Sequence, residues 1–148
     1  YRDPDAAGHD DGWDSRAYDD AVRDVDAYLG GLLDAVDSDP GLADSTYVLL
    51  TADHGGTGTR HNDQSKLRNV TIPLVVWGGD TIEGTDLYAV NPDVRADPGQ
   101  QIPDAEAELP PIRNGGIANL SLDLLGLPPI GESTVNSRAD LQVQGPSR

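Results

Sequence analysis

Two short apolar runs place the strongest constraint on how this chain can fold. One covers residues 46–51, and the other covers residues 72–77 and ends at a Gly-Gly pair. Apolar residues occupy consecutive positions in each run, a pattern that favours a central strand covered on both faces, as in a parallel sheet. Pro73 is expected near the start of its strand, where a missing N–H costs least.

Amphipathic helices are expected before and after these strands. Between residues 15 and 36, apolar side chains recur every three or four positions, which predicts a long helix capped by Asp14 or Ser15. A shorter helix is predicted over residues 117–125. Helix, buried strand, loop and buried strand in this order are typical of an α/β fold.

The remaining segments show little periodicity. Residues 1–13 are rich in Asp and Gly and predict a loop, and residues 78–115 predict a long irregular excursion. The polar tail from residue 131 to residue 148 is expected to fray. Gly30 and Gly31 weaken the first helix, and their presence indicates close packing at that point.

The chain is strongly acidic and contains no cysteine. It has 22 Asp and 4 Glu against 10 Lys and Arg, giving a formal net charge of −16 over 148 residues. This charge argues against nucleic acid and anionic membrane as partners. Disulfides and cysteine–zinc sites are excluded, and no apolar run reaches the length of a membrane span. An Asp-rich, Lys-poor surface is typical of salt adaptation or a high-GC genome. The alternative interpretation is that some of the aspartates bind metal.

All three histidines lie beside an aspartate or in a glycine-rich loop. Asp5 and His9 are four residues apart, and Asp53 and His54 directly follow the first predicted strand. Open α/β sheets place their sites at this end of a strand. His61 comes seven residues after His54 on the same loop. Carboxylate oxygens and imidazole nitrogens in such groups can converge on a cation.

A calcium loop is a second interpretation of the first of these segments. Four residues match positions 1, 3, 6 and 12 of an EF-hand-like loop: Asp3, Asp5, Gly8 and Asp14. An alanine at position 5, an Asp in place of Glu at position 12 and the lack of a preceding helix argue against it.

Together, the motifs resemble those of the alkaline phosphatase superfamily, closest to its type I phosphodiesterase/nucleotide pyrophosphatase branch. The matching segments are PDAAGH at 4–9, LTADHGG at 50–56, IPLVVWG at 72–78 and LDLLGLP at 122–128. The resemblance implies an α/β, alkaline phosphatase-like domain with a mostly parallel sheet flanked by helices. Residues 1–130 would form the carboxy-terminal part of that domain, and residues 131–148 would form a polar tail.

The resemblance also implies a site for two divalent metal ions, usually zinc. One ion would be held by Asp5, His9 and His61, and the other by Asp53 and His54. A further Asp and a Thr or Ser nucleophile would come from upstream of this chain. Two cations about 4 Å apart can neutralise the charge on a phosphate ester during in-line displacement.

Other residues have two interpretations each. Arg60, beside His61, could contact a substrate phosphate or be a solvated loop arginine. Thr51 precedes the Asp53 motif but is interpreted as a strand residue. Trp13 and Trp77 could line a pocket, although a buried tryptophan is more often part of a core.

The implied function is hydrolysis of a small-molecule phosphate ester. Sulfatase-like and phosphomutase-like members share much of the metal set and are alternatives, as is a non-catalytic acidic domain. The resemblance favours an exported location. The chain begins at Tyr1 rather than Met, so we expect a carboxy-terminal piece that is inactive by itself.

Overall fold

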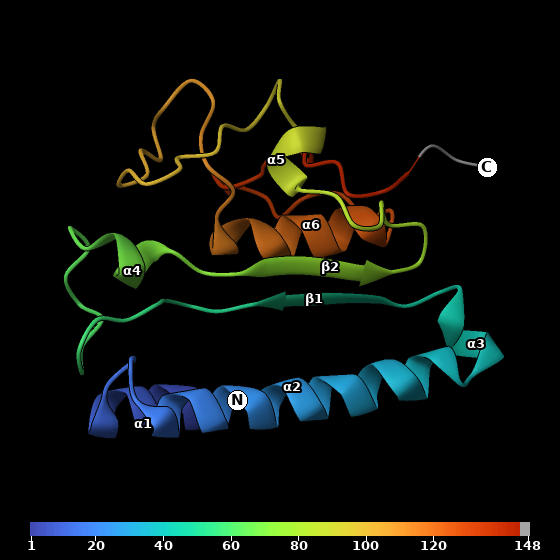
Figure 1. Cartoon of the computed structure of the whole chain (residues 1–148). Coiled ribbons are helices and arrows are strands. Elements are labelled where there is room, and N and C mark those ends of the chain that lie inside the picture. The colour runs from blue at the N-terminus through green and yellow to red at the C-terminus, as the bar shows by residue number, and fades with distance from the viewer. Residues whose placement is uncertain (146–148) are drawn as a thin grey trace. The chain divides into compact units, whose positions relative to one another are not determined.

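The computed structural model describes residues 1–145, which form two compact units. Unit 1 comprises residues 1–46 and 52–73, and unit 2 comprises residues 47–51 and the described chain from residue 74 onward (Figure 1). Unit 1 contains α1 (Asp3–Asp11), α2 (Arg16–Asp37), α3 (Pro40–Ala43) and α4 (Leu67–Val70). Unit 2 contains β1 (Tyr47–Thr51), β2 (Leu74–Gly78), α5 (Leu87–Val90), the 3-10 helix η1 (Asn114–Gly116) and α6 (Ile117–Leu124).

The long predicted helix of unit 1 is confirmed as α2. Its first turn is capped by Ser15, whose Oγ accepts a hydrogen bond from the backbone N–H of Tyr18 at 3.1 Å. The prediction of close packing at Gly30 and Gly31 was wrong, because a Cβ at either position would meet no heavy atom within 4 Å. No helix in residues 1–145 is long and apolar enough to cross a membrane.

The predicted loop over residues 1–13 was wrong, because residues 3–11 form α1. Pro4 lies in the first turn, where its missing N–H breaks no helical bond, and Asp3 and Asp5 interact favourably with the helix N-terminus. The helix ends at Gly12, which has a φ of 100°. A helical backbone cannot wrap a cation as an EF-hand loop does, so the calcium interpretation was wrong as well. Within unit 1, α1 packs against α2.

Both predicted strands form, but they pair antiparallel and not parallel. In this register Tyr47 lies opposite Gly78, and Leu49 lies opposite Val76. A parallel sheet is not present among the described residues, where β1 and β2 form the sheet. A continuous apolar run indicates that both faces of a strand are covered. It does not indicate whether the neighbouring strand runs parallel or antiparallel. A parallel neighbour would need a crossover connection, usually a helix, whereas the one helix between these strands, α4, has four residues.

The core of unit 2 lies between the sheet and α6, the helix predicted over residues 117–125 (Figure 1). Leu120 on this helix is 1% exposed and clusters with Leu141 and Val143. Leu49 and Val76 pack against the cluster from the two strands.

The tail from residue 131 was predicted to fray, but its described part, which ends at residue 145, pairs with other segments of unit 2. The backbone N–H of Ile82 donates to the carbonyl of Val143 at 2.9 Å, and Thr81 pairs with Gln144 in a β-bridge. The three large apolar residues of the tail, Val135, Leu141 and Val143, were too few to indicate packing from the sequence alone. Residues 146–148 lie outside the described chain.

Candidate metal centre

The first two predicted ligands share one face of α1. Asp5 and His9 are one helical turn apart, so both side chains project from the same side. The Oδ1 of Asp5 lies 3.5 Å from the Nε2 of His9. The helix that replaces the predicted loop therefore brings these two residues together by its own geometry.

The other predicted ligands lie on the loop that follows β1. Gly55 shapes this loop, because its N–H donates to the carbonyl of Asn69 at 3.0 Å and a Cβ would collide with the carbonyl oxygen of Arg68. Asn69 is 4% exposed; its side chain accepts a hydrogen bond from Thr57 and donates one to the carbonyl of Asp63. The buried Asn69 thus fixes both halves of the loop. The sequence carried no signal for this role.

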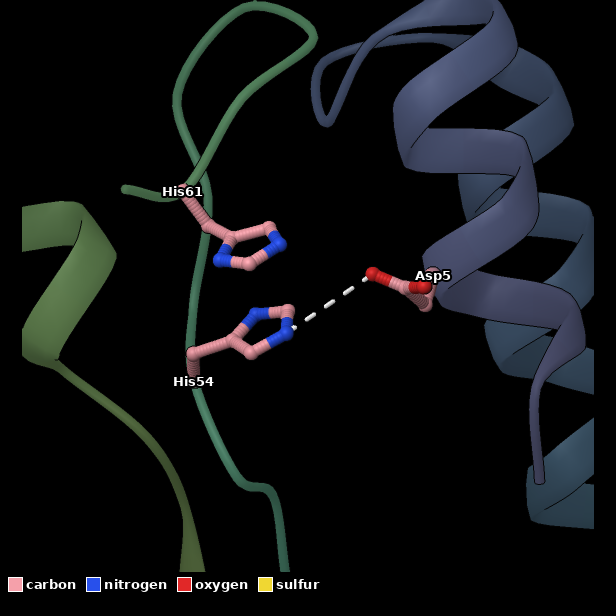
Figure 2. A group of neighbouring side chains, drawn as sticks. All are labelled: Asp5, His54 and His61. Carbon is pink, nitrogen blue, oxygen red and sulfur yellow. Dashed lines mark ion pairs between the residues drawn. The ribbon is translucent and has the colours of Figure 1, made fainter. Parts of the chain in front are cut away.

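The helix and the loop meet at a group formed by Asp5, His54 and His61 (Figure 2). One potential ligand atom from each residue lies within 4.8 Å of the other two. The Nε2 of His54 is 3.8 Å from Asp5 Oδ1, and the rings of His54 and His61 stack with centroids 3.6 Å apart. This group could hold a metal ion.

His9 and Asp53 lie at the edges of the same group. The ring centroids of His9 and His61 are 5.1 Å apart, and Asp53 Oδ2 is 3.6 Å from His54 Nε2. All five predicted ligands are therefore neighbours within unit 1. The central three residues come from both of the predicted ligand sets, so the structure does not separate the two sets.

The hydrogen bonds of two histidines leave the correct nitrogen available for metal. The Nδ1 of His9 lies 3.0 Å from the carbonyl oxygen of Thr59, and the Nδ1 of His54 lies 2.9 Å from that of Gly55. A carbonyl oxygen only accepts, so each Nδ1 carries a proton; in the neutral tautomer with this arrangement, Nε2 has the lone pair that a metal needs. Metal-binding histidines are commonly oriented by such a backbone contact. The donor set therefore fits a zinc-type cation.

An open hollow of about 420 Å³ adjoins the cluster. His9 and His61 form part of its wall, and the remaining lining residues are Thr59, Arg60 and Asn62. Arg60 is exposed here, so its guanidinium can reach an anionic molecule in the hollow. The position is compatible with the predicted contact to phosphate.

An exposed ion pair ties α4 to the segment before α2. Arg68 donates to both carboxylate oxygens of Asp14, at 2.6 and 3.0 Å. The hydrogen bonds from Arg68 hold the pKa of Asp14 below its usual value, and the same contact raises the pKa of Arg68. Such a two-pronged pair restricts orientation more than a single contact does.

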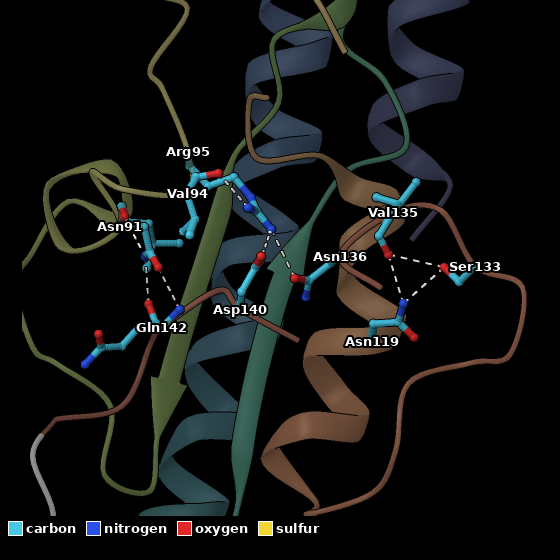
Figure 3. Close-up of polar contacts among 10 residues, drawn as sticks. Asn91, Val94, Arg95, Asn119, Ser133, Val135, Asn136, Asp140 and Gln142 are labelled. Atoms are coloured by element: carbon cyan, nitrogen blue, oxygen red, sulfur yellow. Dashed lines mark hydrogen bonds and ion pairs between the residues drawn. The ribbon is translucent and has the colours of Figure 1, made fainter. Parts of the chain in front are cut away.

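A second group of polar side chains lies in unit 2 and joins distant parts of the chain (Figure 3). Arg95 is 9% exposed and donates to Asp140 at 2.7 Å. The side chain of Asn91 both donates to and accepts from the backbone of Gln142. These contacts fasten the irregular segment predicted over residues 78–115 to the tail.

A comparison of sequences identifies the family. The sequence model described as type I phosphodiesterase / nucleotide pyrophosphatase matches residues 1–115, which is most of the chain. The chain belongs to this family. No curated protein and no solved structure matches it. The matched range includes every candidate ligand and Arg60, and membership in the type I phosphodiesterase family supports hydrolysis of phosphate esters as the general activity.

Proposed function

We propose that this chain carries metal-binding residues of a phosphodiesterase or nucleotide pyrophosphatase-like hydrolase that uses two divalent cations, with zinc preferred. One observation carries the proposal: Asp5 of α1 and the loop histidines His54 and His61, which come from two segments distant in the sequence, bring ligand atoms within 4.8 Å of one another. Imidazole and carboxylate together suit zinc better than calcium or magnesium, which prefer oxygen alone.

The five ligands divide between two adjacent ions in this proposal. Asp5, His9 and His61 hold one, and Asp53 and His54 hold the other. Asp5, assigned to the first ion, contacts His54, assigned to the second. This contact supports two ions bound next to each other and argues against two separate, distant sites. When bound, the ions supply Lewis-acid stabilisation of the charge on the transferring phosphoryl group.

The remaining roles in this proposal belong to groups that bind and orient the substrate. Arg60 binds a phosphate oxygen in the hollow beside His61. A local cation is needed here, because the chain's net charge of −16 repels an anionic substrate at long range. The nucleophile is a Thr or Ser upstream of these residues. Thr51 is unsuited to that role, since it is a strand residue of β1 paired opposite Leu74.

The test measures metal content and hydrolysis in the full-length protein. Metal analysis is expected to find two transition-metal ions per chain, together with hydrolysis of bis(p-nitrophenyl) phosphate. Asp5→Asn and His54→Ala are expected to lower zinc affinity at least 10- to 100-fold, the range seen even for residues that only support a ligand. Asp10→Asn is the matched control, because Asp10 is an exposed residue of α1 outside the cluster.

Three results would contradict the proposal. The first is a protein that binds no stoichiometric metal. The second is full phosphodiesterase activity in Asp5→Asn. The third is hydrolysis of an aryl sulfate in place of the phosphate diester, which would favour a sulfatase-like reaction at the same residues.

A further inference from the structure

A buried tryptophan touches all three histidines of the metal centre. Trp13 is 7% exposed and lies in the turn between α1 and α2. Its ring centroid is 5.1 Å from that of His9, 5.9 Å from that of His61 and 6.4 Å from that of His54. The interplanar angles of 63–80° make each contact edge-to-face, the favourable arrangement for aromatic pairs.

Two glycines, one from each histidine-bearing segment, make room for this indole. A Cβ at Gly8 would lie 2.7 Å from the nearest ring atoms of Trp13, and one at Gly56 would collide with the same ring. Neither glycine has a positive φ, so backbone conformation does not require glycine at these positions. Close approach to Trp13 does. Gly8 of the PDAAGH motif and Gly56 of the DHGG motif thus share one physical cause.

The indole is held in place independently of the histidines. The backbone N–H of Trp13 donates to the carbonyl of Gly58 at 2.8 Å, which joins the α1–α2 turn to the loop. The ring of Tyr18 also lies near the indole, with ring centroids 6.2 Å apart. Trp13 therefore contacts both segments that carry candidate ligands and is itself fixed by contacts outside the cluster.

We propose that Trp13 is a positioning residue that holds the three imidazoles in the orientation required for metal binding. Its role in metal binding rests on the proposed function, whereas the ring contacts can be measured without metal. The indole restricts the histidine side chains before an ion arrives, so less conformational entropy is lost on binding. Trp13 acts through the histidines and need not touch the substrate.

The experiment uses the full-length protein and the variants Trp13→Leu and Trp13→Phe. In the metal-free protein, Trp13→Leu is expected to shift the C–H resonances of His9, His54 and His61, because the ring current of the indole is lost. Zinc affinity, measured by competition with a chromophoric chelator, is expected to fall about 10- to 100-fold, as for other residues that orient ligands. The visible spectrum of the cobalt(II)-substituted protein is expected to change as well. Trp13→Phe keeps an aromatic ring and is expected to recover part of the affinity.

Trp77→Phe is the matched control, since Trp77 is the other tryptophan of the chain and lies on β2. It should leave zinc affinity and the cobalt spectrum unchanged. If the wild type binds zinc and a folded Trp13→Leu variant binds it equally well with an unchanged spectrum, the positioning role alone is overturned. If Trp13→Leu does not fold, wild-type affinity in Trp13→Phe with no histidine shifts overturns it instead. A wild type that binds no zinc overturns the proposed metal site and the positioning role with it.

Discussion

The two units use their buried side chains differently. In unit 1 the buried Trp13 and Asn69 contact or hold the segments that carry the candidate ligands. In unit 2 the buried Leu120, Leu141 and Val143 form an apolar cluster against the sheet, with no candidate ligand among them. Buried side chains therefore support a candidate site in one unit and cohesion in the other.

This difference predicts which property a mutation should weaken in each unit: stability in unit 2 and metal affinity in unit 1. Removing a buried group of unit 2 leaves a cavity, so the free energy of unfolding should fall. Removing a contact around the histidines of unit 1 frees a few side chains, so metal affinity should change more than stability. Substitutions can test this division directly.

The largest expected effect is on the core of unit 2. Leu120→Ala is expected to lower the free energy of unfolding by about 3 kcal/mol, because Leu120 is 1% exposed and a cavity would remain. Chemical denaturation followed by circular dichroism measures this. Leu125→Ala on the next turn is the control; Leu125 is 70% exposed, so its change should be within about 0.5 kcal/mol.

Zinc affinity of the folded Leu120→Ala protein should equal that of the wild type. A large loss of affinity at temperatures where the variant remains folded would mean that the core of unit 2 also maintains the metal centre. The comparison between the units would then fail.

The elements that the sequence predicted correctly are those with a clear apolar pattern, periodic in the helices and continuous in the strands. The helix α2, the helix α6 and the strands β1 and β2 all have one. Helix α1 has none, since its sequence DPDAAGHDD is almost entirely small or acidic, and its start depends on Pro4 and nearby carboxylates. Strand direction was not predictable, because a covered strand shows the same apolar run whether its neighbour is parallel or antiparallel.

The candidate site was easier to predict than the fold around it. The spacing of Asp5 and His9 and the position of Asp53 and His54 after a strand located four of the clustered side chains. The supporting residues were not predictable from spacing. Trp13 becomes part of the site only because Gly8 and Gly56 let two distant segments approach it, and such a contact exists only in three dimensions.

A smaller effect on the free energy of unfolding is expected at two glycines of unit 1, and its sign should differ between them. Gly30→Ala should raise the free energy of unfolding by roughly 0.5–1 kcal/mol, because alanine favours the helix and a Cβ meets no atom within 4 Å. Gly56→Ala should lower it, because the new Cβ would collide with Trp13. Thermal unfolding of both variants measures the contrast. Equal shifts in the same direction would show that the space around Gly56 is not restricted.

The smallest expected effect concerns a pH-sensitive contact of unit 2. Tyr47 donates to Asp80 at 2.5 Å, and Gln144 donates to the same carboxylate at 3.0 Å. The hydrogen bond from Tyr47 is the main cause that lowers the pKa of Asp80, and the bond to Asp80 is the main cause that raises the pKa of Tyr47. The ion pair of Asp14 and Arg68 in unit 1 should persist at alkaline pH, unlike the contact of Tyr47 and Asp80, because arginine stays charged there.

The signs of these shifts define a pH window for the contact of Tyr47 and Asp80. The contribution of Asp80 to stability is present above its ordinary pKa of 3.8 and is lost as pH falls through its lowered value in the folded state. That of Tyr47 is present below pH 10 and is lost as pH rises through its raised value. Tyr47→Phe should therefore raise the pKa of Asp80 towards its ordinary value, as measured by the carboxyl carbon shift in an NMR titration. Tyr28→Phe, an exposed tyrosine of α2, should leave that titration unchanged, and an unmoved Asp80 in Tyr47→Phe would assign the lowered pKa to Gln144.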